Sequence, residues 1–293
     1  MKRITLLILT VCIALCASTT IASAWGKIGH ATIAQVAENH LTPAAKATLN
    51  EYLGGLKLAA IASDADTYRG KWVVDLGFVP TNPDDARVSF VKSFDFTTPL
   101  NISPYSHSIT VDEDFVCYLS DNLNGKYINN CAFYIDNLAR ELKKKGAKMS
   151  AEERHMKIAL IVHLVGDLHC PMHIVYYPKN THKGQIDVKW KKKEYSMHSI
   201  WDKYLFEAYY DWSFIDMAYL VDTATPEEIK KITKGDIYDY SGKSAKDSWP
   251  AVSVYKDGDI LPESYATDVR PILFKQLRNG GYRLAAVLNA IFE

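Results

Sequence analysis

The segment 158–173 holds the densest group of metal-binding and acid–base side chains in the sequence. It reads Ile-Ala-Leu-Ile-Val-His-Leu-Val-Gly-Asp-Leu-His-Cys-Pro-Met-His, and its apolar flanks predict a buried helix. His163 and Asp167 are four residues apart and share one helix face, whereas Pro171 should end the helix and let His173 turn back toward them. Burying these groups without partners is costly. A metal ion removes that penalty, so a metal site is favoured over core histidines bonded to backbone carbonyls.

A second pair with the same spacing, His198 and Asp202, lies at the start of another expected helix. Taken alone, this pair could be an ordinary contact on a helix surface. Two His-x-x-x-Asp pairs, each among apolar neighbours, together favour a site for several zinc ions with nitrogen and oxygen ligands.

The N-terminal residues 1–24 have the pattern of a secretory signal peptide: a basic start, an apolar stretch and the small residues Ala-Ser-Ala before residue 25. The apolar stretch is too short to span a membrane, although a retained anchor is the alternative. Cleavage makes Trp25 the first residue of a secreted or periplasmic domain, 25–293. Its free α-amino group has a pKa of about 8, so a nearby zinc ion could displace the proton. Core packing of the tryptophan is the alternative.

Composition sets limits on the substrate. The chain has 34 basic and 34 acidic residues, and the leader removes two basic residues and no acidic ones, which leaves a formal charge of −2. The mature chain therefore has no general positive field for gripping duplex nucleic acid, and a polyanion must be held locally. Of three remaining cysteines, Cys117 and Cys131 can form a disulfide bond, which leaves Cys170 unpaired.

Helix signals dominate the rest of the chain. Thr42-Pro43 and Thr225-Pro226 are typical helix starts, and we expect helices at 28–40, 131–145, 151–170, 198–210, 226–233, 264–278 and 282–292. The region 71–110 should be irregular or weakly β-stranded, and 174–197 could form a hairpin over the site. The sequence therefore predicts a mainly α, single-domain fold with irregular or short β excursions, and we expect a monomer.

These motifs resemble the zinc-dependent single-strand-specific nucleases and 3′-nucleotidases, which include secreted fungal nucleases, plant bifunctional nucleases, and protist and bacterial relatives. The matching segments, in order along the mature chain, are Trp25-Gly-x-x-Gly-His30, Ala65-Asp66-x-x-Arg69, His163-x-x-Gly-Asp167-x-His-x-Pro-x-His173, His198-x-x-Trp-Asp202 and, more loosely, 281–289. The resemblance implies a helical fold related to that of zinc-dependent phospholipase C, and three zinc ions.

The family pattern also implies which residues hold the ions and touch the substrate. The ligands grouped by ion are Asp66, His107, His163 and Asp167 for the first; His173, His198 and Asp202 for the second; and Trp25 through its amine and carbonyl, His30 and the bridging Asp167 for the third. Arg69 would contact the phosphoryl oxygens. Lys183 and Gln185 stand where the family has a Gly-Gly-Asn loop and are expected to bind substrate.

The implied reaction is hydrolysis of single-stranded DNA or RNA to 5′-nucleotides, with possible 3′-nucleotidase activity. A hydroxide bridging two zinc ions would attack phosphorus in line and expel the 3′-oxygen. Asp66 could orient the hydroxide and Arg69 could stabilise the transition state. One alternative is a zinc-dependent phospholipase C, which would need an apolar membrane-docking surface. Another is a non-catalytic zinc-binding protein, which Arg69 and the complete ligand set argue against.

The chain also departs from the family pattern. His107 lies 41 residues after Asp66 and is followed by Ser108, where an aromatic residue that stacks a base is usual. Asp64 likewise replaces an aromatic residue, a change that we expect to affect substrate choice more than metal binding. His40 and His155 lie near helix ends, where solvent or capping roles are expected.

Overall fold

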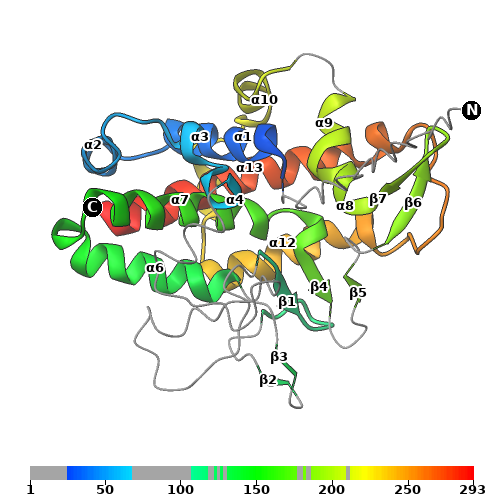
Figure 1. Ribbon diagram of the computed structural model, residues 1–293, viewed down its shortest axis with the longest axis horizontal. Helices are drawn as coiled ribbons and strands as arrows, with labels where there is room; N and C mark the ends of the chain where they lie inside the picture. Colours follow the sequence, from blue (N-terminus) through cyan, green and yellow to red (C-terminus); the bar gives the residue numbers. More distant parts are fainter. Residues whose placement is uncertain are drawn as a thin grey trace, which may run out of the picture.

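The computed structural model describes residues 25–67, 107–117, 122–123, 126–127, 131–176, 181–182, 186–208 and 212–293, which are mostly helical (Figure 1). The mainly α fold class is confirmed. The helices are α1 (Lys27–Asn39), α2 (Pro43–Tyr52), α3 (Leu58–Ile61), α4 (Asp64–Thr67), α6 (Cys131–Lys145), α7 (Ala151–Leu168), α8 (Met197–Ser199), α9 (Leu205–Glu207), α10 (Phe214–Val221), α11 (Pro226–Ile232), α12 (Ile237–Val252) and α13 (Tyr265–Phe292).

Helix α7 forms the centre of the core, and every residue from Met156 to Leu168 is buried. It contacts α6, α13, α1 and α4, and in Figure 1 it runs across the middle of the molecule. Ser150 caps its N-terminus by accepting a hydrogen bond from the Glu153 amide. An apolar helix that is covered on all sides is the arrangement the sequence predicts, so the polar groups on α7 lie in the interior.

The expected helix starts are confirmed. Thr42 accepts a hydrogen bond from the Ala45 amide at 3.3 Å, and Thr225 forms a reciprocal capping box with Glu228. Pro171 ends the buried helix as expected: α7 stops at Leu168, and a 3₁₀ turn, Pro171–His173, follows.

The strands are short and form three small sheets. Strand β1 (Ile109–Val111) pairs in parallel with β4 (Ile174–Tyr176), which pairs antiparallel with β5 (Thr181–His182). Two antiparallel pairs complete the set: β2 (Asn122–Leu123) with β3 (Lys126–Tyr127), and β6 (Asp187–Trp190) with β7 (Lys193–Ser196). The β6–β7 pair is the hairpin expected within 174–197. Of the region 71–110, residues 71–106 lie outside the described residues.

Helix α13 corrects one expectation. We expected separate helices at 264–278 and 282–292, but α13 is continuous from Tyr265 to Phe292. The glycines allow α1 and α13 to approach closely: a Cβ atom at Gly281 would lie 2.4 Å from Cβ of Val36. Helices α10 and α12 were not expected. Serines, a glycine and Pro250 hide the helical pattern of α12.

The cysteines correct a second expectation. Cys117, Cys131 and Cys170 are buried and form no disulfide bond, so the structure does not contain the disulfide expected between the first two. Burial, together with the negative charge of Asp167, raises the pKa of Cys131 well above its usual value. A thiol that stays protonated is a poor nucleophile for disulfide exchange.

Among the described residues, no helix is long and apolar enough to cross a membrane.

The glycine pair in α13 gives a test of the packing. Gly281→Ala should lower the free energy of unfolding by about 1–3 kcal/mol, because overpacking against Val36 outweighs the better helix propensity of alanine. Gly280→Ala is the matched comparison, since its Cβ would lie 3.2 Å from side-chain atoms of Ile33 and His169, farther than the 2.4 Å at Gly281. We expect a smaller loss there. Urea denaturation of both variants checks this, and equal losses would contradict it.

Candidate metal centre

The expected ligands within the described residues come from distant parts of the sequence and meet around the C-terminal half of α7. Of the other expected site residues, Arg69, Lys183 and Gln185 lie outside the described residues. The cluster draws on several elements. They are α1 (His30), α4 (Asp66), the segment just before β1 (His107), α7 (His163 and Asp167), the 3₁₀ turn (His173) and the helical turn after β7 (His198 and Asp202).

Asp167 is the centre of the cluster. Its Oδ2 lies 2.5 Å from Nδ1 of His107 and 3.3 Å from Nε2 of His163, and its Oδ1 lies 3.3 Å from Nε2 of His30. Asp66 approaches from α4, with Oδ1 3.5 Å from Nε2 of His163. One fully buried carboxylate therefore contacts three imidazoles, as a ligand shared between metal ions would.

A second group of ligands lies beside this one. The Nε2 atoms of His173 and His198 are 2.7 Å apart, and Nε2 of His198 lies 3.3 Å from Oδ2 of Asp202. Asp202 lies in a π-helical turn, Ile200–Tyr204, between α8 and α9. Such turns are rare and occur often at functional sites. Two imidazole nitrogens that face each other closely are a suitable pair of donors for one cation.

The start of the described chain is fixed against both groups. Trp25 is fully buried, and its ring packs against Trp201 and Phe206. The Gly26 amide donates a 2.9 Å hydrogen bond to the carbonyl oxygen of Asp202. One turn later, the His30 ring stacks on His163 with centroids 4.0 Å apart. The chain at residue 25 thus lies beside the site, where a free terminus could contribute.

Glycines in the motifs make room for these contacts. A Cβ atom on Gly166 would lie 2.5 Å from Nδ1 of His30, and one on Gly26 would lie 2.3 Å from the carbonyl oxygen of Asp202. Real Cβ atoms do not approach other atoms so closely. The spacing His-x-x-Gly-Asp on α7 is therefore needed for α1 to bring His30 against the helix.

Backbone carbonyls fix the orientation of two ligand rings. His163 donates from Nδ1 to the Ala62 carbonyl at 2.9 Å, and His173 donates from Nδ1 to the His107 carbonyl at 2.8 Å. In the neutral ring, the Nε2 lone pair is then directed into the cluster. Such outer contacts set the tautomer of metal-binding histidines and raise their basicity as ligands.

His169 supports the site from behind. Its Nδ1 donates to the Val165 carbonyl at 2.8 Å, and its Nε2 accepts a 2.9 Å hydrogen bond from Nη1 of Arg283. Burial and the charge of Arg283 lower the pKa of His169 to about 3, so the ring is neutral. In the sequence, Arg283 stands out only as part of the loose match at 281–289. A single arginine has no spacing pattern that would predict a buried supporting role.

The electrostatics of the site favour a bound cation. Burial, followed by the negative charges of Asp167 and Asp66, raises the pKa of Asp202 well above its usual value. Burial opposes ionisation of Asp167 as well, but His163 and His107 hold its pKa well below the usual range. The same carboxylates, working against burial, raise the pKa of His163 to about 9. Several carboxyl groups thus lie close together with few positive charges beside them, and a divalent cation would stabilise their ionised forms.

The donor atoms fit a metal ion in number and type. Both ring nitrogens of His30 and Oδ1 of Asp167 are buried and form no hydrogen bond within the described residues. Two compact groups have ligand atoms within 4.8 Å of one another: His30, Asp66 and His163, and His107, Asp167 and His173. These two groups do not match the ligand sets that were expected for the separate ions, because Asp167 and His163 lie between the groups. The division by ion therefore stays a prediction.

Two further histidines contact carboxylates from distant segments. His155 on α7 lies with Nε2 2.8 Å from Oδ2 of Asp64 on α4. His40, just after α1, lies with Nε2 2.8 Å from Oδ1 of Asp222. From the sequence, only solvent or capping roles were expected for both histidines. Their partners are 91 and 182 residues away, and no nearby sequence pattern indicates such contacts.

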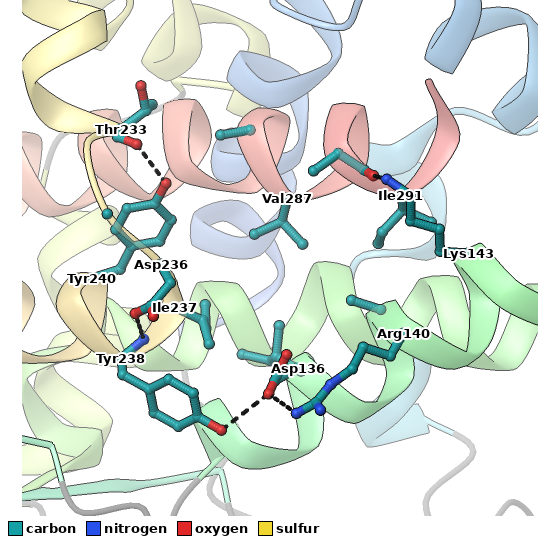
Figure 2. A pocket seen from close by; sticks show the side chains of 15 residues that line it. Asp136, Arg140, Lys143, Thr233, Asp236, Ile237, Tyr238, Tyr240, Val287 and Ile291 are labelled. Carbon is teal, nitrogen blue, oxygen red and sulfur yellow. Dashed lines mark hydrogen bonds and ion pairs between the residues drawn. The ribbon is translucent and has the colours of Figure 1, made fainter.

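A cavity of about 600 Å³ lies away from these ligands, between α6, the start of α12 and the end of α13. Figure 2 shows its polar groups paired with one another: Tyr238 donates to Asp136 at 3.2 Å, Arg140 forms an ion pair with the same carboxylate, and Lys143 donates to the Ala290 carbonyl. None of the expected ligands lines it. The chemistry that the sequence predicts is therefore at α7.

Comparison with known proteins gives one family and several relatives. The family model described as S1/P1 Nuclease matches residues 25–293. Endonuclease 2 of Arabidopsis thaliana is 25% identical over 288 residues, which cover 92% of this chain and 90% of that protein. Nuclease S1 of Aspergillus oryzae is 25% identical over 301 residues, 91% of each chain. Nuclease P1 of Penicillium citrinum is 29% identical over 188 residues, 62% of this chain and 58% of that protein.

The contact between Gly166 and His30 gives a test of the site. Gly166→Ala should displace the His30 ring and weaken binding of a divalent cation by about 10- to 100-fold. Competition with a chromophoric chelator measures this affinity. Gly146→Ala is the matched control, because its Cβ would have only an ordinary 3.4 Å contact with the Tyr52 ring. Equal affinities in the two variants would remove His30 from the metal site.

Proposed function

The chain belongs to the S1/P1 nuclease family and is a nuclease, and from this premise we propose that it is a zinc-dependent phosphodiesterase. Its substrate is single-stranded DNA or RNA, which it cleaves to 5′-nucleotides, and it also acts as a 3′-nucleotidase. The observation that carries the proposal is the set of imidazoles around Asp167, with carboxylates from α4 and the π-helical turn beside it. Family membership favours this function over a phospholipase C or a non-catalytic zinc protein.

Three zinc ions would be held by the ligands that converge around α7. Nitrogen and oxygen donors without cysteine are the typical set for catalytic zinc, and the buried imidazoles and carboxylates of this site fit that description. The expected ligands are Trp25, His30, Asp66, His107, His163, Asp167, His173, His198 and Asp202.

Processing at residue 24 would complete the site. The family model begins its match at residue 25, which supports removal of residues 1–24 as a signal peptide and a secreted or periplasmic location. Trp25 is buried next to the ligands, and Gly26 is hydrogen-bonded to Asp202. Cleavage there frees an α-amino group beside His30, where it can donate its lone pair to a cation.

Bound zinc would supply hydroxide near neutral pH, by lowering the pKa of water, and would stabilise charge that develops on oxygen. The chain's residues position the reactants. The side chain of Asp66 is 13% exposed, so its carboxylate can orient the attacking water from the open side of the cluster. Arg69, Lys183 and Gln185 are proposed to bind the phosphoryl group and the rest of the substrate. Local contacts of this kind suit a chain without a general positive field.

The substrate proposal is tested with the purified mature protein. We expect release of 5′-mononucleotides from single-stranded nucleic acid, and loss of this activity after treatment with a strong chelator, because no protein group replaces the metal's charge. Product analysis on single-stranded DNA, RNA, 3′-nucleotides and phosphatidylcholine gives the substrate range. Readdition of Zn²⁺ is the control and should restore turnover. Full activity in the chelator would reject the zinc mechanism.

The role of the terminus is tested separately. A protein with one extra residue before Trp25 should lose most of its activity, because its α-amino group is moved away from His30. A protein with one extra residue after Glu293, which is exposed, is the matched control and should be fully active. Steady-state rates and thermal denaturation of both proteins provide the comparison. Undiminished turnover of the protein with the extra N-terminal residue would show that the Trp25 amine is not part of the site.

A further inference from the structure

We propose that Asp64 and His155 form a positioning pair that sets the location of Asp66 and thereby tunes the metal affinity of the site. This inference rests on the proposed function, because it takes Asp66 to be a metal ligand. From the sequence alone, Asp64 is expected to affect substrate choice more than metal binding. The structure gives Asp64 a different partner, a histidine on the central helix.

The geometry of the pair is that of a specific contact. Nε2 of His155 lies 2.8 Å from Oδ2 of Asp64, and the two side chains are only 28% and 19% exposed. His155 lies near the start of α7 and Asp64 is the first residue of α4. Asp66 follows two residues later in the same short helix. A displacement of Asp64 is therefore passed directly to the ligand.

Helix α4 needs such external support. It has four residues, and helices of this length are not stable by themselves. The segment before it is tied to α1, since Glu38 accepts hydrogen bonds from the Leu58 amide at 3.1 Å and from Lys57 at 2.8 Å. These anchors lie at the far end of the segment from Asp66. The contact with His155 acts within α4 itself.

Two histidines of α7 contact the segment 62–64, which leads to Asp66. His163 bonds the Ala62 carbonyl at 2.9 Å, and His155 pairs with Asp64. The two histidines are eight residues apart on α7, or about 12 Å along its axis. Ala65 is buried in the core and fixes the depth of α4, and the two polar contacts add a constraint on the direction of the segment that carries Asp66. The pair thus aims Asp66 at Nε2 of His163.

The contribution of the pair should be larger for metal binding than for folding. A partly exposed contact of this kind adds little to global stability. In contrast, metal affinity depends on ligand placement within a fraction of an ångström, and loss of an outer support typically weakens it about 10- to 100-fold. Loss of the pair is therefore expected to weaken metal binding clearly while it lowers the stability of the fold only slightly.

The test uses the mature protein and its variants Asp64→Ala, His155→Ala and the double variant. We expect each single change to weaken Zn²⁺ binding about tenfold in a competition titration and to alter the absorption spectrum of bound Co²⁺. The double variant should bind no more weakly than either single one, because both remove the same contact. His155→Gln keeps an N–H donor, and we expect it to retain most of the affinity.

His40→Ala is the matched control. The His40–Asp222 pair has the same 2.8 Å separation and similar exposure, 31% and 16%, but it ties α1 to the residue after α10. We expect this variant to show a similar small shift in thermal stability with unchanged Zn²⁺ affinity and Co²⁺ spectrum. The comparison separates a general loss of packing from an effect on the ligand.

The outcomes distinguish this inference from the proposed function. A parent protein that binds no divalent ion and does not cleave nucleic acid contradicts the function. A parent protein that does both, with Asp64→Ala and His155→Ala variants that bind Zn²⁺ as tightly as the His40→Ala control, overturns the positioning pair. If an alanine variant does not fold, Asp64→Leu replaces it, since leucine has a similar branched shape but cannot accept a hydrogen bond from His155. Weakened binding then supports the pair, and unchanged binding overturns it.

Discussion

The charged carboxylate of Asp167 inside the protein is the interaction on which the rest of the structure depends. It is fully buried and contacts His30, His107 and His163. An isolated buried carboxylate would be very unfavourable, so each contacting ring must be held in place by another element. Carbonyls orient His163 and His173, Gly166 admits His30, and α4 is tied to α7. The helices around α7 therefore serve as supports for a few polar atoms.

Much of the site could be predicted from the sequence, because its signals are local. The four-residue spacing within each His–Asp pair places both side chains on one helix face, and Pro171 marks where α7 must end. The caps at Thr42 and Thr225 are equally local. These features depend only on residues within one or two helical turns, and the structure confirms them.

The features that could not be predicted depend on contacts between distant segments. Glycines at 280 and 281 disfavour a helix locally, yet in α13 they allow close packing on α1, so tertiary packing outweighs propensity. The partners of His40 and His155 are far away in the sequence. The division of ligands among ions is also a three-dimensional property, since Asp167 contacts histidines that were expected to bind two different ions. Arg69, Lys183 and Gln185 lie outside the described residues.

The π-helical turn Ile200–Tyr204 gives one residue two separate tasks. The side chain of Asp202 faces His198, while its main-chain carbonyl receives the Gly26 amide. A substitution at this position keeps the carbonyl that docks the chain start, whereas removing one residue from the turn would shift the carboxylate and the carbonyl together. Point mutation and deletion at the same turn are therefore different perturbations: the first alters a donor, and the second also releases the beginning of the fold.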